Sequence, residues 1–94
     1  MKIRWLLKAV NDLEDIHEYI SLDDISAARR ELEKIIEAIS LLIENPEIGR
    51  KGRVDNTREL VVTNSPYIIA YRLKEGFVEI LRILHGSLKW PEAF

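Results

Sequence analysis

The chain has 94 residues, 47% of them hydrophobic, which suits one small domain because a second hydrophobic core could not close at this length. It contains no cysteine, so disulfide bonds, thiolate chemistry and metal sites with cysteine ligands are excluded. The net charge is −2, but residues 1–49 carry 6 basic and 11 acidic side chains (−5), whereas residues 50–94 carry 8 basic and 5 acidic ones (+3). Such asymmetry allows one face to bind a polyanion and another a basic partner, although an ordinary solvated surface has similar charges.

No segment of the sequence has the pattern of a membrane anchor or an export signal. No apolar run approaches the roughly 20 residues that span a bilayer. The first residues, MKIRWLLKAVND, lack a long apolar stretch and a small-residue cleavage site. We therefore expect a protein of the cytoplasm, where reducing conditions suit a chain without cysteine.

The first half of the chain predicts a short strand and two helices. The strand covers residues 2–6, and the first helix covers about residues 8–20. The apolar residues of this helix recur at helical spacing: Ala9, Leu13, Ile16 and Ile20. Asp23 or Asp24 is expected to cap a second helix that runs to about Glu44. Its apolar residues show the same spacing: Ile25, Ala28, Leu32, Ile35, Ile39 and Leu42.

The second half predicts a loop and three strands. Pro46 ends the second helix because proline cannot continue the hydrogen-bond ladder, and residues 47–57 have the composition of a loop. Strands are expected at about residues 58–63, 67–73 and 77–85, with Gly76 at a positive φ in the last turn. The last strand is apolar on both sides, which predicts an internal strand. Strict alternation would place its apolar residues in two groups: Val78, Ile80 and Leu84 on one side, and Phe77, Leu81 and Ile83 on the other.

The predicted order is therefore strand, helix, helix and three strands, a β-α-α-β-β-β arrangement of the α+β class. Two helices with a short connection pack as a hairpin, and their joint apolar face needs a sheet to cover it. We expect the helical hairpin on one face of a twisted antiparallel sheet, in a single domain of residues 1–94. The opposite face of the sheet is then left free to form a concave site.

Several segments, in this order and at this spacing, carry a resemblance to a known family. They are Asp12, Leu13, Ile16, Tyr19 and Ile20 in the first helix, then residues 45–50 (NPEIGR), 57–62 (TRELVV), 67–72 (YIIAYR) and 78–85 (VEILRILH), and finally Trp90 with Pro91. Together they resemble the ParE/RelE superfamily of bacterial toxins from type II toxin–antitoxin modules, over almost the whole chain. The resemblance implies a growth-arresting toxin that a cognate antitoxin neutralises in a hetero-oligomer.

The superfamily implies two different targets. ParE-like members are not nucleases and poison DNA gyrase, whereas RelE-like members cut messenger RNA, usually on the ribosome. RelE-like nucleases carry extra basic residues on the strand before the segment Tyr67 to Tyr71, where this chain has the apolar run 60–63 (LVVT). That run and the tail 86–94, a region important for target engagement in the ParE branch, favour a gyrase inhibitor. A RelE-like ribonuclease is the alternative, and a non-toxic relative that only binds antitoxin is a third.

A ribonuclease of this kind would use His85, Arg82 and Arg58. Metal-independent RNA cleavage needs an acid or base for the 2′-hydroxyl and the leaving oxygen, which His85 could supply. It also needs cations for the phosphate, and the planar fork of arginine fits phosphate oxygens. Each residue has a structural alternative: His85 as a hydrogen-bonding residue at a strand end, Arg82 paired with Glu79 or an acidic helix residue, and Arg58 in an exposed pair with Glu59.

Five further residues are candidates for contact with nucleic acid or another target: Arg50, Lys51, Arg53, Lys89 and Trp90. Trp90 either closes the sheet edge or forms a contact hot spot. Tyr67 and Tyr71 fit core packing better than base stacking, and Trp5 fits a core position. No cofactor and no metal are expected. On the first helix, no residue at i+4 spacing from His17 could act as a second metal ligand.

Overall fold

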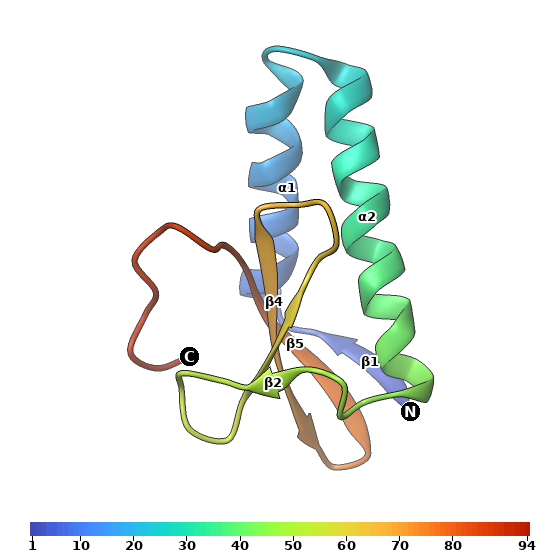
Figure 1. The fold of residues 1–94 in the computed structure, drawn as a ribbon, viewed down its shortest axis with the longest axis vertical. Helices are drawn as coiled ribbons and strands as arrows, with labels where there is room; N and C mark the ends of the chain where they lie inside the picture. Colours follow the sequence, from blue (N-terminus) through green and yellow to red (C-terminus); the bar gives the residue numbers. More distant parts are fainter.

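Two amphipathic helices cover one face of a five-stranded sheet in the computed structural model, which describes residues 1–94 (Figure 1). The helices are α1 (Leu7–Ser21) and α2 (Ile25–Glu44). The strands are β1 (Lys2–Trp5), β2 (Arg50–Lys51), β3 (Arg58–Val61), β4 (Tyr67–Lys74) and β5 (Phe77–His85). The α+β class and the predicted order of elements are confirmed, and each expected helix and strand is within two residues of its predicted bounds.

The helix ends follow the chemistry expected from the sequence. The Asp24 carboxylate caps α2 by accepting a hydrogen bond from the N–H of Ala27 at 3.1 Å. Asn45 ends the helix immediately before Pro46. At the same end the N-terminal ammonium group of Met1 donates to the carbonyl of Ile43 at 2.6 Å, a favourable place for a positive charge because helix C-termini carry partial negative charge. Neither helix combines the length and apolar composition needed to cross a membrane.

The sheet has the order β1-β5-β4-β3-β2, and it is antiparallel except at one edge. There β1 pairs with β5 in parallel, with Lys2 opposite Phe77 and Trp5 opposite Ile80, so the sheet is mixed. At the other edge the two-residue strand β2, within the segment expected to be a loop, pairs Arg50 with Glu59. Two residues are too few to show an alternating pattern in the sequence.

A β-bulge interrupts the pairing of the two central strands. Tyr71 lies opposite Ile80, but its neighbour Ala70 lies opposite Arg82, so Leu81 is an extra residue in β5. An extra residue reverses the faces of the side chains that follow it.

The bulge therefore changes which residues of β5 reach the core. Val78 and Ile80 pack under the helices, and so does Ile83 beyond the bulge. Leu84 packs on the opposite face, against a cluster that includes Ile68. The predicted grouping of Leu84 with Val78 and Ile80 is wrong, because strict alternation holds only without a bulge. The prediction of an internal strand is confirmed, since β5 lies between β1 and β4.

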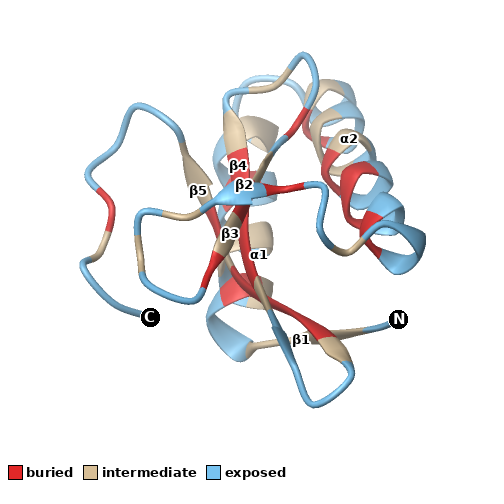
Figure 2. Ribbon diagram, turned by 60° about the horizontal axis from the view of Figure 1, so that its bottom comes forward, coloured by how far each residue is buried: buried red, intermediate tan, exposed pale blue.

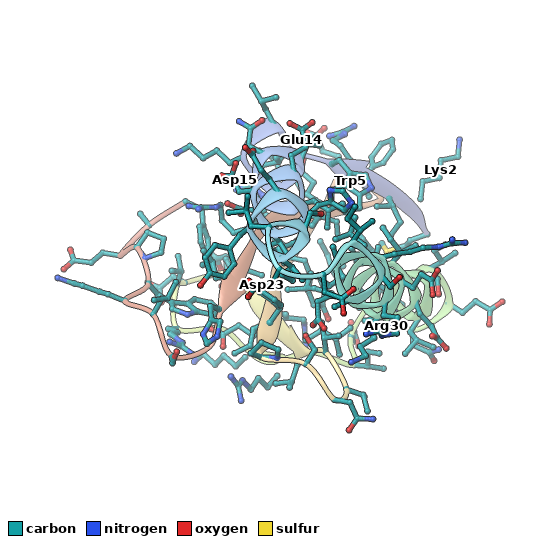
Figure 3. All side chains as sticks on the ribbon, turned by 90° about the horizontal axis from the view of Figure 1, so that it is seen from above. Lys2, Trp5, Glu14, Asp15, Asp23 and Arg30 are labelled. Carbon is teal, nitrogen blue, oxygen red and sulfur yellow. The ribbon has the colours of Figure 1, made fainter.

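The main core lies between the helical hairpin and the sheet. It is formed by Ala9, Ile16, Ile35, Ala38, Ile39, Leu42, Val62, Ile69, Tyr71, Val78, Ile80 and Ile83. Trp5, beside α1 in Figure 3, is only partly buried and packs against the margin of this core. The acidic side chains of Glu14 and Asp15 lie on the outer side of α1, as amphipathic spacing predicts (Figure 3).

Candidate functional site

The structure places seven of the eight candidate residues in three separate regions and the eighth, Lys89, outside them. His85 and Arg82 lie at the end of β5, and Arg58 and Lys51 face each other on β3 and β2. Three others meet on the sheet face opposite the helices, and Lys89 is exposed in the tail. These three are Arg50, Arg53 and Trp90.

Arg82 is bound to the first helix. Its guanidinium donates Nε–H to Oδ2 of Asp12 at 2.7 Å and Nη2–H to Oδ1 at 2.9 Å, a bidentate pair. These hydrogen bonds, together with the negative charge of Asp12, raise the pKa of Arg82 above its ordinary value. The structural alternative for Arg82, an ion pair with an acidic helix residue, is therefore confirmed. The guanidinium donates its hydrogen bonds to Asp12 rather than to an external ligand.

His85 lines a groove between α1, the ends of β4 and β5, and the tail. The groove has a volume of about 720 Å³, and its apolar lining includes Ile20 and Leu88. The ring of His85 meets Tyr67 edge-on with centroids 5.6 Å apart. Its Nδ1 accepts the backbone N–H of Ser87 at 3.1 Å, which leaves the proton of the neutral ring on Nε2. His85 therefore stabilises the turn into the tail, and its Nε2 has no hydrogen-bond partner in the protein.

Arg58 and Tyr71 hold the turn that follows α2. Arg58 donates Nη1–H to the carbonyls of Glu47 at 3.1 Å and Gly49 at 2.9 Å. The Tyr71 hydroxyl donates to the carbonyl of Pro46 at 2.8 Å and accepts the N–H of Gly49 at 2.9 Å. Burial raises the pKa of Tyr71. A Cβ at position 49 would lie 2.5 Å from the Tyr71 hydroxyl, so this close approach needs glycine.

The three residues of the expected ribonuclease site do not converge. Arg58 lies opposite Tyr71 on one side of β4, and His85 lies opposite Tyr67 on the other side, four residues along the strand. Standard strand spacings then separate the Cα atoms of Arg58 and His85 by about 16 Å. The Arg58 guanidinium is also directed to the turn after α2, and that of Arg82 to Asp12. The three side chains are therefore not arranged to contact one phosphate group together.

A buried carboxylate organises the sheet face opposite the helices. Glu59 is 3% exposed, and its Oε1 accepts Nη2–H of Arg50 at 3.0 Å. Its Oε2 accepts the backbone N–H of Arg53 at 2.8 Å and lies 3.4 Å from Nε of the same residue. Glu59 was not among the site residues predicted from the sequence. The sequence does contain a signal for its role: Glu59 is the one acid within an apolar strand and has several arginines nearby, and a buried charge needs such partners.

The tail covers part of this face. Trp90 is 9% exposed and packs against Ile68 and Ala70, with the Arg53 guanidinium 3.8 Å above the centre of its ring. In Figure 2 the C-terminal tail lies beside the sheet, and one buried stretch, in red, interrupts its exposed course. The expectation of a free opposite face is therefore wrong, because Trp90 packs on the face of the sheet rather than closing its edge.

A basic hollow lies at the start of β3. It is lined by Lys51, Asn56, Thr57, Arg58, Arg72 and Leu73, without an acidic residue, and has a volume of about 470 Å³. Arg72 is paired with Glu79 at 2.6 Å, whereas Lys51 is exposed and forms no ion pair. No group of three histidine, cysteine, aspartate or glutamate side chains is placed to hold a metal ion.

Residues 3–90 match the family model described as the ParE toxin of the type II toxin–antitoxin system parDE. The chain belongs to the ParE toxin family. Relatives of this ParE family member include a putative toxin, Y4kP, of Sinorhizobium fredii, 45% identical over 97% of this chain and 94% of the relative. Toxin RelE2 of Caulobacter vibrioides is 37% identical over 92% of this chain and 96% of its own length.

A solved structure of the chromosomal ParDE toxin–antitoxin system from P. aeruginosa has the same fold. Its chain is 30% identical, with a TM-score of 0.81 over 90% of this chain and 95% of that one. The predicted membership of the ParE/RelE superfamily is confirmed. This ParE family member is thus a toxin of a type II toxin–antitoxin module, and that membership supports a cognate antitoxin as its partner.

Proposed function

We propose that this ParE family member inhibits DNA gyrase without enzymatic activity and that it acts in the cytoplasm. The observation that carries the proposal is that the two guanidinium groups that a ribonuclease would need for phosphate binding are hydrogen-bonded within the protein itself. Arg82 is bound to Asp12, and Arg58 is bound to backbone carbonyls of the turn after α2, away from His85. Acid–base catalysis of RNA cleavage needs the base and the phosphate-binding cations within a few ångströms of one another.

The composition of β3 supports the same proposal. Its central residue Glu59 is a buried acid whose two oxygens are occupied by Arg50 and Arg53. The next residues, Leu60 and Val61, are apolar, and Leu60 packs on the main core. The strand therefore presents no row of unpaired basic side chains to which an RNA backbone could bind.

Target contact is proposed for the tail and the adjoining basic residues. Lys89 is exposed and unpaired next to Trp90 in the chain, and Trp90 lies under the Arg53 guanidinium, which shares the Glu59 carboxylate with Arg50. Lys51 is a further candidate in the separate basic hollow at the start of β3. An aromatic residue beside arginines is a common composition for a contact hot spot.

The test is a DNA supercoiling assay with purified gyrase and purified toxin. We expect inhibition of supercoiling or trapped DNA cleavage, and relief of either by the cognate antitoxin. A parallel incubation with messenger RNA, free and on translating ribosomes, is expected to leave the RNA intact. Active gyrase together with cut messenger would reject the proposal.

The alternative is a RelE-like endonuclease, and one observation favours it. His85, whose Nε2 has no hydrogen-bond partner in the protein, lines a groove together with Tyr67, whose pKa is raised by burial and by the nearby Glu31. The same incubation decides between the two functions. The third possibility, a non-toxic relative, predicts normal growth when the chain is expressed without antitoxin.

The antitoxin is proposed to bind the helical hairpin and the outer edge of β3. Leu22, Ile25 and Ile36 on the hairpin are exposed apolar residues, and Val61 is exposed on the strand. A second groove runs between α2 and β3 beside Val61, and Leu41 contributes to its lining. A disordered partner could order on such surfaces as it binds. Co-purification with the product of the neighbouring reading frame tests this, and a toxin that remains alone would contradict it.

A further inference from the structure

The C-terminal tail, residues 86–94, is held to the domain mainly by one side chain. The Gly86 N–H donates to the carbonyl of Pro66 at 2.8 Å, and the Leu88 N–H donates locally to His85. Residues 89–94 form no hydrogen bond with any part of the chain. Leu88 is 63% exposed, whereas Trp90 is 9% exposed. The position of the distal tail therefore depends on Trp90.

The buried residue Glu59 positions Trp90 indirectly, through Arg53. The Arg53 guanidinium covers its ring at 3.8 Å, and Arg53 is fixed through its backbone N–H and its Nε by the carboxylate of Glu59. Arg50 supplies a second positive partner to the Glu59 carboxylate, which is 3% exposed. Glu59 thus acts on Trp90 through Arg53.

One buried polar group opposes the closed position of the tail. The indole N–H of Trp90 is buried without a hydrogen-bond partner, which costs the bond it would form with water. The cation–π contact with Arg53 and the apolar contacts with Ile68 and Ala70 offset that cost. A segment held by one side chain with an unsatisfied donor belongs to the least stable part of a fold.

We propose that Trp90 is a releasable cover over an apolar surface, and that Glu59, through Arg53, sets how often the cover is open. The surface beneath it consists of Ile68, Ala70 and Leu84. Ala70 has no exposed area, and its small side chain leaves room for the indole ring. The consequence for activity rests on the proposed function: gyrase contacts the opened tail and the surface that it uncovers.

The test measures the accessibility of the Trp90 indole. In a Trp5→Phe background, Trp90 is the only tryptophan, and acrylamide quenching reports its exposure. Arg53→Met removes the cation, and loss of a cation–π contact changes the closed-to-open ratio by roughly two- to fivefold. Glu59→Gln should produce a change in the same direction. Arg29→Met is the matched control, because it removes an arginine of an exposed pair with Glu33 on α2.

Quenching in Arg53→Met equal to that in Arg29→Met would overturn the proposal. Arg53 is an exposed residue, so the variant should keep its fold, which far-ultraviolet circular dichroism verifies. If Glu59→Gln does not fold, Arg53→Met alone decides.

Supercoiling inhibition by the Glu59→Gln variant then tests whether opening of the Trp90 cover affects gyrase. Glu59 is buried and does not contact a target directly, so a change in potency that follows the quenching supports the link between the cover and gyrase. If the wild-type protein inhibits gyrase and quenching is the same in all variants, the cover is rejected and the proposed function stands. If quenching rises and no form of the protein inhibits gyrase, the cover stands and the proposed function is rejected.

Discussion

The Asp12 carboxylate closes the open edge of β5 by binding both the side chain of Arg82 and the backbone next to it. β1 pairs with β5 only as far as Ile80, after which the chain turns into α1. Asp12, one turn into that helix, accepts the N–H of Ile83 at 2.9 Å as well as the two guanidinium bonds. An unpaired strand edge is thus satisfied by a helix side chain, which fixes α1 to the strand that ends in His85.

Asp12→Asn is expected to lower the free energy of unfolding by about 2 kcal/mol, the usual loss when a hydrogen bond to a charged group is removed in a partly buried place. For a chain of this size that corresponds to a fall in melting temperature of roughly 8–16 °C. Asp15→Asn is the control, since Asp15 is exposed and forms no ion pair. Equal melting temperatures for the two variants would show that the Arg82 pair contributes nothing to stability.

Tyr71→Phe should destabilise the protein by roughly 1–3 kcal/mol, because the buried N–H of Gly49 and the partly buried carbonyl of Pro46 each lose their partner. Urea unfolding followed by circular dichroism measures the change. Tyr19→Phe serves as the control, since Tyr19 is 75% exposed and its hydroxyl forms no hydrogen bond in the protein. The prediction fails if both variants unfold at the same urea concentration.

Stability should decline in acid partly because of Glu79. Hydrogen bonds from Arg72, and to a smaller extent from Arg4, hold the pKa of Glu79 below its ordinary value. A carboxylate with a lower pKa in the folded state stabilises the fold above its unfolded pKa, which is about 4.3. That contribution is lost as the pH falls through the lowered pKa.

Unfolding of the wild-type protein and of Glu79→Gln, measured between pH 7 and pH 3, tests this effect. The difference in free energy of unfolding between the two should be largest near neutral pH and should narrow in acid. A difference that is independent of pH would exclude Glu79 as a cause of acid sensitivity.

His85→Asn is expected to leave growth arrest almost unchanged, because the amide oxygen can still accept the N–H of Ser87. A change of less than about twofold in toxicity suits a gyrase inhibitor, whereas loss of a general acid or base lowers catalysis by about 10²- to 10⁴-fold. Induced expression without antitoxin provides the measurement, and His17→Asn on α1 provides the matched histidine control. Complete loss of toxicity only in the His85 variant would favour the ribonuclease.

Much of the fold was predictable because its signals are local. The apolar spacing of the two helices, the cap at Asp24 and the stop at Pro46 each depend on a few neighbouring residues. The candidate site was less predictable, because its residues are defined by partners far away in the sequence. Arg82 and Asp12 are 70 residues apart, and the Arg53 guanidinium lies over a Trp90 ring from another part of the chain.

The sequence alone was enough to predict the family, through its resemblance to known toxins. It also predicted both helices and every strand except β2, because apolar periodicity and turn chemistry are local signals. Only the tertiary structure decided that β1 joins β5 in parallel and that the bulge at Leu81 exchanges the faces of β5. It also decided that Arg58 and Arg82 bind their own chain and that Trp90 covers the sheet. These features depend on which buried charges and backbone groups find partners after the layers have packed, and that choice has no local signature.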